Sequence, residues 1–201
     1  EFSNFLIKRG FWSIFLEFTV VNFGIWFDLY FRTFLFQVIA ALGVGFIIIG
    51  LSYNISSKTL GIIGITIIFS HQLVNFIPLA NYPVIKAVLS PLFVSGVIPL
   101  STNTILYIGY PPIPWLGFLL IGYGMGHFFL RNDNSRRMIK LGISFILLFI
   151  LIRFINIYGD PAIWSTQKNH LFTFLSFINV SKYPPSLLFV LLMLGIAFLI
   201  I

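Results

Sequence analysis

The stretch IKLGISFILLFILIRFINIY (139–158) carries two basic residues, Lys140 and Arg153, among mainly apolar side chains. A helix that crosses the hydrocarbon core of a bilayer needs about 20 predominantly apolar residues. Apolar runs in soluble proteins are usually shorter, roughly 10–14 residues. The stretch therefore predicts a transmembrane helix.

The whole sequence has the composition of a membrane protein. Of its 201 residues, 59% are hydrophobic and 8% are charged, and the mean hydropathy is +1.03. About a quarter of the residues of a soluble domain are charged. The net charge of +7 indicates membrane topology rather than a nucleic-acid partner. The sequence has no cysteine, which excludes disulfides and thiolate metal sites.

Six apolar segments predict an all-α fold, a polytopic transmembrane helical bundle. We expect a single transmembrane domain over 1–201, truncated at both ends, so that about six helices belong to a larger bundle. The connection 79–110 is too broken by prolines for a spanning helix and reads as interfacial or re-entrant pieces, whereas 159–183 is more polar. The six segments lie at about 10–28, 33–52, 59–78, 111–130, 139–158 and 184–201.

Basic residues in the short connections predict the orientation, because Lys and Arg are enriched in cytoplasmic loops. If the helices alternate, one side holds more basic residues than the other, and we expect that side to be cytoplasmic. Aromatic residues at segment ends, such as Trp164 and Tyr183, fit an interfacial belt. The basic residues of the expected cytoplasmic side are Lys8, Arg9, Lys58, Arg131, Arg136, Arg137 and Lys140.

Ionisable residues inside the predicted helices are candidates for function, since a charge in hydrocarbon is unfavourable and normally faces the bundle interior. Glu17 lies near mid-membrane, and a neighbouring helix that satisfies its carboxylate is the alternative to a role in binding or proton transfer. His71 shares a helical stripe with Asn75. Its imidazole suits proton transfer, although a neutral histidine bonded to a helix partner is equally compatible.

The exit of the 139–158 segment, RFINIYGDPAIWS (153–165), concentrates polar residues on one face. Arg153, Asn156 and Asp160 follow at i, i+3 and i+7, which indicates a polar wall facing outward. The alternative for Arg153 is a side chain that snorkels to the interface. Gly122 and Gly126, four residues apart in the 111–130 segment, together with Gly117 predict close helix packing.

Several stretches together resemble bacterial membrane proteins of the heparan-alpha-glucosaminide N-acetyltransferase catalytic-domain family, in the transmembrane acyltransferase group. The resemblance covers most of the chain outside 79–109. The family's essential histidine lies in a region with an Asp-His or Asn-rich signature that this sequence does not contain. The stretches are KRGFWSIFLEFTVVNFG (8–24), IIFSHQLVN (67–75), YPPIPWLGFLLIGYGMG (110–126), RFINIYGDPAIWS (153–165) and QKNHLFTFLSFINVSKYPPSLLFVLLMLG (167–195).

This resemblance implies a protein of the bacterial inner membrane that moves an acyl group from cytoplasmic acetyl-CoA, or another acyl-CoA, to a saccharide on the far side. The candidate bases or nucleophiles are His71 and Glu17. Such a reaction also needs cations for the CoA phosphates and a polar vestibule for the acceptor. Candidates for the CoA phosphates are Arg9, Lys58, Arg136 and Arg137. Candidates for the acceptor are Asn75, Arg153, Asn156, Asp160, Trp164 and Lys168.

Two other classes of function stay open on the sequence alone. A transporter or flippase would line a path with the same buried polar residues, although no inverted repeat is visible. A structural subunit of a membrane complex would use Glu17, Arg153 and Asp160 as interhelical ion pairs. Lipid is the expected surrounding, with a second copy or another membrane protein as a candidate partner, and no metal is expected because the three histidines are scattered.

Overall fold

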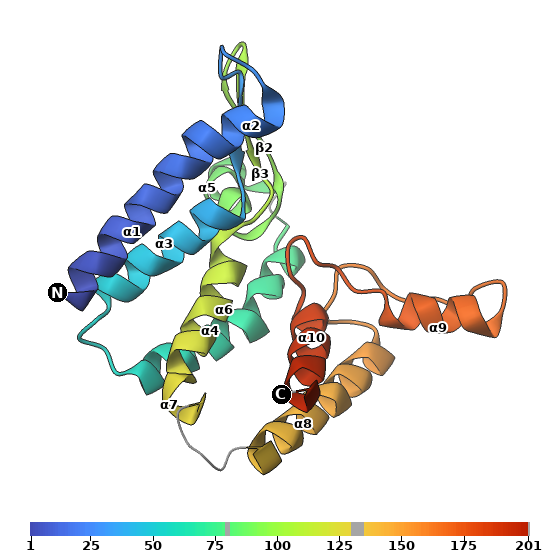
Figure 1. Ribbon diagram of the computed structural model, residues 1–201. Coiled ribbons are helices and arrows are strands. Elements are labelled where there is room, and N and C mark those ends of the chain that lie inside the picture. The colour runs from blue at the N-terminus through green and yellow to red at the C-terminus, as the bar shows by residue number, and fades with distance from the viewer. Residues whose placement is uncertain (79–80, 130–134, 201) are drawn as a thin grey trace. The chain divides into compact units, whose positions relative to one another are not determined.

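The computed structural model describes residues 1–78, 81–129 and 135–200, and these are mostly helical. The chain forms two compact units: Glu1–His71 with Ile77–Gly126, and Gln72–Phe76 with His127–Ile201. We call them unit 1 and unit 2. Figure 1 shows the elements of both. Arg131, which was counted in the predicted orientation, lies outside the described residues.

Unit 1 begins with a continuous helical run. It consists of α1 (Phe2–Leu16), a π-helical segment η1 (Glu17–Val21) and α2 (Asn22–Trp26). The run ends at Phe27, which adopts a left-handed conformation with φ 49°. The Asp28 carboxylate accepts hydrogen bonds from the backbone N–H groups of Arg32 and Tyr30, which lower its pKa. The chain thereby turns back toward the next element.

The predicted helix 33–52 is divided in the structure. Its first residues form strand β1 (Thr33–Phe36), and α3 (Val38–Leu51) follows. β1 pairs in parallel with β3 (Thr104–Ile108), which pairs in antiparallel with β2 (Gly96–Ser101), so the sheet order is β1-β3-β2. The prediction of a purely helical chain is therefore wrong at these strands. They form because Thr and Phe favour extended backbone and because β3 supplies hydrogen-bond partners from a distant part of the chain.

The other helices of unit 1 are α4 (Ser57–Ser70), α5 (Pro83–Phe93) and α6 (Pro112–Gly124). α4 begins where the Ser56 hydroxyl accepts a hydrogen bond from the Thr59 backbone N–H at 3.1 Å, as an N-cap does. α1 packs on α3, and α4 packs on α6. The core of these pairs is apolar and consists of Leu6, Ile49, Leu60, Leu116 and Leu120.

Unit 2 contains α8 (Ser135–Ile155), α9 (His170–Ile178) and α10 (Leu187–Ile200). The 3-10 turn η2 (His71–Phe76) continues α4, and its residues Gln72–Phe76 belong to unit 2. The short helix α7 (Gly126–Phe129) follows α6. α8 packs along α10, at a close approach of Gly142 and Gly195. Figure 1 shows α9 pointing sideways, away from both.

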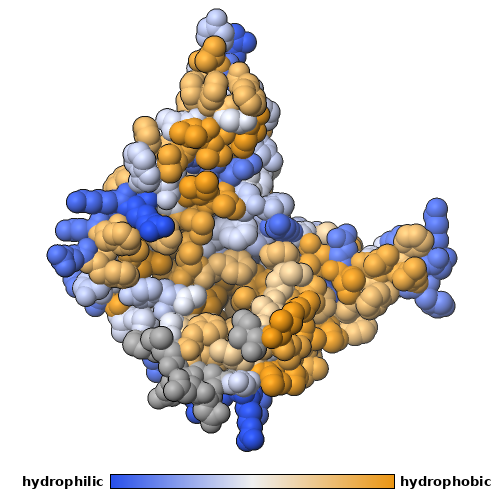
Figure 2. All heavy atoms as spheres, in the orientation of Figure 1, coloured by the Kyte–Doolittle hydropathy of each residue, from blue (hydrophilic) through white to orange (hydrophobic). Residues whose placement is uncertain are grey.

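Among the described residues, two helical stretches are long and apolar enough to cross a membrane, Ser57–Phe76 and Ser135–Ile155. They match the segments predicted at 59–78 and 139–158. The segments predicted at 33–52, 111–130 and 184–201 form shorter apolar helices; α3 with 14 residues is about 21 Å long. Apolar side chains are exposed over much of the visible surface of unit 2 (Figure 2).

Candidate functional site

Arg153, in the last turn of α8, is buried with 2% of its surface exposed. Its guanidinium donates to four backbone carbonyl oxygens: Nε to Phe177 at 2.8 Å, Nη1 to Ala162 at 2.8 Å, and Nη2 to Ser176 at 3.0 Å and to Asn179 at 2.7 Å. The side chain does not snorkel away from the protein. It ties the end of α9 to the end of α8.

Asn156 and Trp164 are joined by a pair of hydrogen bonds. Asn156 Nδ2 donates to the Trp164 carbonyl oxygen, and the Trp164 backbone N–H donates to Asn156 Oδ1, both at 3.0 Å. The indole Nε1 of Trp164 donates to the Arg153 carbonyl oxygen at 2.8 Å. Asn156 has φ 56°, a conformation that asparagine tolerates. Asn156 therefore ends α8, and its side chain also binds the backbone of Trp164 in the loop that follows.

Asp160 closes the same loop at its other end. Its Oδ1 accepts from the Ala162 N–H at 2.8 Å and from the Ser181 hydroxyl at 2.9 Å, and its Oδ2 accepts from the Ser181 N–H at 2.8 Å. Arg153, Asn156, Asp160 and Trp164, which we call the polar cluster, are thus brought together by the loop that follows α8. The predicted polar wall on one helical face is wrong, because α8 ends at Ile155 and Arg153 is buried. Their polar groups bond to their own chain, so they shape the loop, and contact with a ligand stays a prediction.

A cavity of about 150 Å³ lies beside the polar cluster within unit 2. Gln72, Asn75 and Asp160 are its polar lining residues. Gln72 is 6% exposed, and its Oε1 atom is buried with no hydrogen-bond partner. The Tyr158 side chain also lines the cavity wall. Of the predicted acceptor residues, Asn75 and Asp160 therefore share one cavity, and Lys168 is exposed elsewhere.

Gln72 was not among the residues predicted for the site. The signal that reveals it is its burial without a partner for Oε1. A buried polar atom is normally hydrogen-bonded, so the unpaired Oε1 distinguishes Gln72 among the residues that line the cavity.

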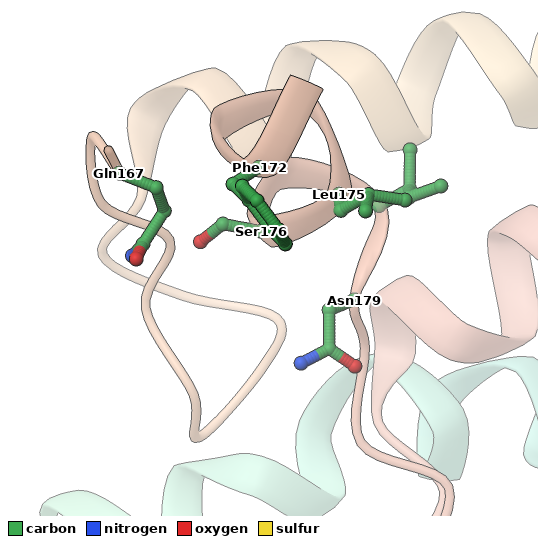
Figure 3. Close-up of a pocket in the computed structure, with 6 residues that line it drawn as sticks. Gln167, Phe172, Leu175, Ser176 and Asn179 are labelled. Carbon is green, nitrogen blue, oxygen red and sulfur yellow. The ribbon is translucent and has the colours of Figure 1, made fainter. Parts of the chain in front are cut away.

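A larger, open groove of about 590 Å³ runs along α9 (Figure 3). Figure 3 shows Ser176 turned toward Gln167, with Phe172 and Leu175 above and Asn179 below. The Ser176 hydroxyl accepts from the Ser165 N–H at 3.2 Å, and Gln167 Nε2 donates to the Ser165 hydroxyl at 2.9 Å. Because these polar groups are already bonded, the smaller cavity is the better candidate for a polar ligand.

Glu17 is 1% exposed and lies in the π-helical segment of unit 1. Its Oε2 accepts a hydrogen bond from the Ala40 N–H at 3.0 Å. Ala40 is in the first turn of α3, where the N-cap residue Gln37 makes no side-chain bond. Glu17 thus caps α3 from a neighbouring helix, where a negative charge is favourable. Its predicted role as a base stays a prediction.

The π turn also changes which residues share the buried face with Glu17. The Asn22 N–H donates to the Glu17 carbonyl oxygen, an i to i+5 bond, so Asn22 lies one turn after Glu17. An α-helix would place residues i and i+5 on different faces. Both side chains are 1% exposed, and Glu17 Oε1 and Asn22 Oδ1 have no partner.

His71 is 4% exposed at the end of α4. Its Nδ1 lies 2.9 Å from the Ile68 carbonyl oxygen and 3.2 Å from that of Ile67. A carbonyl can only accept, so Nδ1 carries the proton, and Nε2 is the basic nitrogen of the neutral ring. These two contacts of His71 Nδ1 lie within α4, whereas the bond of Glu17 reaches α3.

The four residues predicted to bind CoA phosphates, Arg9, Lys58, Arg136 and Arg137, are all exposed. Arg9 and Lys58 belong to unit 1, and Arg136 and Arg137 begin α8 in unit 2. Arg9 lies over the Phe5 ring, 5.8 Å from its centroid.

The described residues contain no group of three or more His, Asp or Glu side chains that could hold a metal ion. They do contain two places for polar chemistry, His71 in unit 1 and the cavity beside Asp160 in unit 2. No family model, curated protein or solved structure matches this chain.

Proposed function

We propose that the chain is a six-helix part of a polytopic protein of the bacterial inner membrane, and that this protein transfers an acyl group from acyl-CoA to a saccharide. The lengths and compositions of Ser57–Phe76 and Ser135–Ile155 support membrane crossing. The run Phe2–Trp26, about 37 Å long, exceeds the roughly 30 Å of a bilayer core. The shorter helices α3, α6 and α10 complete the proposed bundle.

The observation that carries the acyl-transfer proposal is the polar cavity of unit 2. Its buried residue Gln72 directly follows His71 in the chain. A saccharide offers hydroxyl and amine donors, which suit the unpaired Gln72 Oε1 and the acceptor oxygens of Asn75 and Asp160. In this proposal the acceptor binds there. The general base is His71, the candidate predicted from the sequence, and the proposal assumes no contact between the two units.

The proposed reaction balances without a further reactant. The acceptor nitrogen or oxygen attacks the thioester carbonyl carbon, the C–N or C–O bond forms, and the C–S bond of acyl-CoA breaks. The acceptor loses its proton to His71 Nε2, and that proton passes on to the CoA thiolate. Arg9, Lys58, Arg136 and Arg137 are the proposed cations for the CoA phosphates, as charge-assisted hydrogen bonds would require.

The test is acyl transfer by purified full-length protein in detergent. The protein is incubated with radiolabelled acetyl-CoA and a mixture of amino sugars and oligosaccharides, and labelled product or acyl-protein is measured. We expect transfer that falls at least about 100-fold in His71→Ala, as loss of a general base does. Absence of both transfer and acyl-CoA binding contradicts the enzyme proposal. An unchanged rate in His71→Ala makes His71 a packing residue.

A structural subunit is the second candidate, and one observation favours it. The polar groups of Arg153, Asn156 and Asp160 are bonded to their own loop, as expected for residues that only hold a fold together. The cavity variant Gln72→Leu separates the two functions. Leucine fills the position without an acceptor oxygen, so it should raise KM for the acceptor in an enzyme and change nothing measurable in a structural subunit except stability.

A further inference from the structure

α9 presents its polar side to the protein and its apolar side outward. Thr173 accepts from the Gln167 N–H at 2.9 Å, and Ser176 accepts from the Ser165 N–H at 3.2 Å. Phe177, on the same side of the helix, packs on Trp164 with ring centroids 5.5 Å apart. The polar side of α9 therefore contacts the protein and is not turned toward water.

The opposite side of α9 is an apolar stripe at helical spacing. Leu171, Phe174, Leu175 and Ile178 follow at i, i+3, i+4 and i+7, which places them on one face. Leu171 is 62% exposed, Phe174 58% and Leu175 43%. Contiguous exposed apolar surface of this kind marks contact with a partner or a membrane.

Arg153 fixes the depth of this stripe. It belongs to the last turn of α8 and bonds to carbonyl oxygens of Ser176, Phe177 and Asn179 at the end of α9. Phe177 also packs on Phe154 of α8, with centroids 5.0 Å apart. If α8 crosses the membrane, its last turn lies at the boundary with water, and α9 lies at the same level.

The residues that flank α9 fit a charged interface. Lys168 precedes the helix and Lys182 follows it, and both are exposed. The Lys182 ammonium lies 4.9 Å from the Tyr183 ring centroid. Figure 2 shows hydrophilic residues at the free end of α9 beside its apolar surface. Lysine beside an apolar helix face is the pattern of helices that bind anionic lipids in the interface plane.

We propose that α9 is an interfacial helix whose Leu171–Ile178 stripe inserts into the non-cytoplasmic leaflet, with Lys168 and Lys182 contacting anionic lipid headgroups. The inference rests on the membrane crossing of α8 proposed above and is independent of acyl transfer. It gives the apolar stripe of α9 a partner, a lipid surface. The helix would hold the preceding loop, 156–169, at a fixed depth in the interface.

The test uses spin labels attached to introduced cysteines. The 201 residues contain no native cysteine that would also be labelled. Leu171→Cys and Phe174→Cys label the stripe, Thr166→Cys labels the exposed loop, and Leu147→Cys labels an exposed position of α8. The full-length protein is placed in nanodiscs of phosphatidylethanolamine and phosphatidylglycerol. Accessibility to oxygen, which concentrates in lipid, is compared with accessibility to a water-soluble nickel chelate.

We expect the labels at Leu171 and Phe174 to favour oxygen, at a shallower depth than the label at Leu147, and the label at Thr166 to favour nickel. The double variant Lys168→Gln, Lys182→Gln should raise nickel accessibility at Phe174 at least about twofold, because two contacts with anionic headgroups are lost.

Two results overturn the inference while α8 stays in lipid. They are stripe labels that favour nickel, and stripe labels inaccessible to both reagents, which would mean that a protein surface covers the stripe. A Leu147 label that does not favour oxygen overturns the membrane crossing of α8, and the inference with it.

Discussion

Single charged residues of this chain are buried beside backbone groups. Glu17 accepts from the Ala40 N–H, and Arg153 donates to four carbonyl oxygens. In both cases the partner is an end of a helix or a loop. A charge buried in this way stabilises one specific backbone conformation, because only that conformation supplies enough hydrogen-bond partners for the charged group.

Arg153→Ala should destabilise the protein strongly. It leaves four carbonyl oxygens without their donor, and each unpaired buried group costs about 1–3 kcal/mol, so we expect a loss of at least about 3 kcal/mol in the free energy of unfolding. Arg153→Lys should recover only part of it, since one ammonium cannot reach four directions. Thermal unfolding in detergent, together with the rate of tryptic cleavage after Lys168, measures both variants.

The control for Arg153 is Arg136→Ala, which removes an exposed arginine from the same helix and should change stability by less than about 0.5 kcal/mol. Equal effects of the two alanine variants would show that the carbonyl bonds of Arg153 contribute nothing.

Glu17→Gln should lower stability by less than about 1 kcal/mol, because the amide oxygen can still accept from Ala40 and only the favourable charge at the end of α3 is lost. Glu17→Ala removes the cap and should cost about 1–2 kcal/mol. Melting temperature and acyl transfer are measured on the same samples, and we expect Glu17→Gln to retain transfer. Lost transfer at an unchanged melting temperature would identify Glu17 as the base instead.

Helix pairs within unit 1 approach each other closely where glycines face backbone. A Cβ on Gly64 of α4 would lie 2.7 Å from the Gly117 carbonyl oxygen of α6, and a Cβ on Gly124 would lie 2.5 Å from the Gly61 Cα atom. The prediction of close packing is confirmed at Gly117, where a Cβ would lie 3.0 Å from side-chain atoms of Ile67 and Ile68. It is wrong at Gly122 and Gly126, where a Cβ would meet nothing within 4 Å. The helical face that packs is the one that carries Gly117 and Gly124.

Gly64→Ala should therefore destabilise the α4–α6 pair. The added methyl group meets backbone that cannot move aside, and overpacking of this kind costs about 1–3 kcal/mol. Gly122→Ala is the matched control on the partner helix and should be neutral or stabilising by up to about 1 kcal/mol, since alanine is the better helix former. Thermal unfolding of both variants checks the assignment, and a reversed order would refute it.

At the scale of the whole molecule, the basic residues predict which ends of the helices face the cytoplasm. The first turns of α8 contain Arg136, Arg137 and Lys140. If α8 crosses the membrane as proposed, these residues predict a cytoplasmic first turn. The loop 156–183 and α9 are then non-cytoplasmic. This arrangement is the one that the proposed acyl transfer requires.

Single cysteines test this orientation in intact cells. Thr166→Cys should react with a membrane-impermeant maleimide added from outside, whereas Ser135→Cys should react only after the membrane is permeabilised. Both positions are exposed, so a difference in labelling would reflect the side of the membrane and not burial in the protein. Labelling of Ser135→Cys in intact cells would invert the topology and move the proposed acceptor site to the cytoplasm.

Apolar composition and helical runs were readable from the sequence because both are local properties. Hydropathy is a sum over neighbouring residues, and helix hydrogen bonds reach only four residues along the chain. The helices α4 and α8 therefore lie where the segments 59–78 and 139–158 predicted them. The grouping of Arg153, Asn156 and Asp160 by helical spacing was wrong, because α8 ends at Ile155 and the following loop brings the three together.

The tertiary structure alone decided what those residues bind. The strand Thr33–Phe36 depends on a partner strand at Ile105–Ile108. The carboxylate of Glu17 finds its donor 23 positions away, and the guanidinium of Arg153 finds an acceptor 26 positions away. No local pattern encodes such pairings, because they form only when packing brings distant backbone groups together. For the same reason the outward apolar stripe of α9 became recognisable only once its polar side was seen to be occupied.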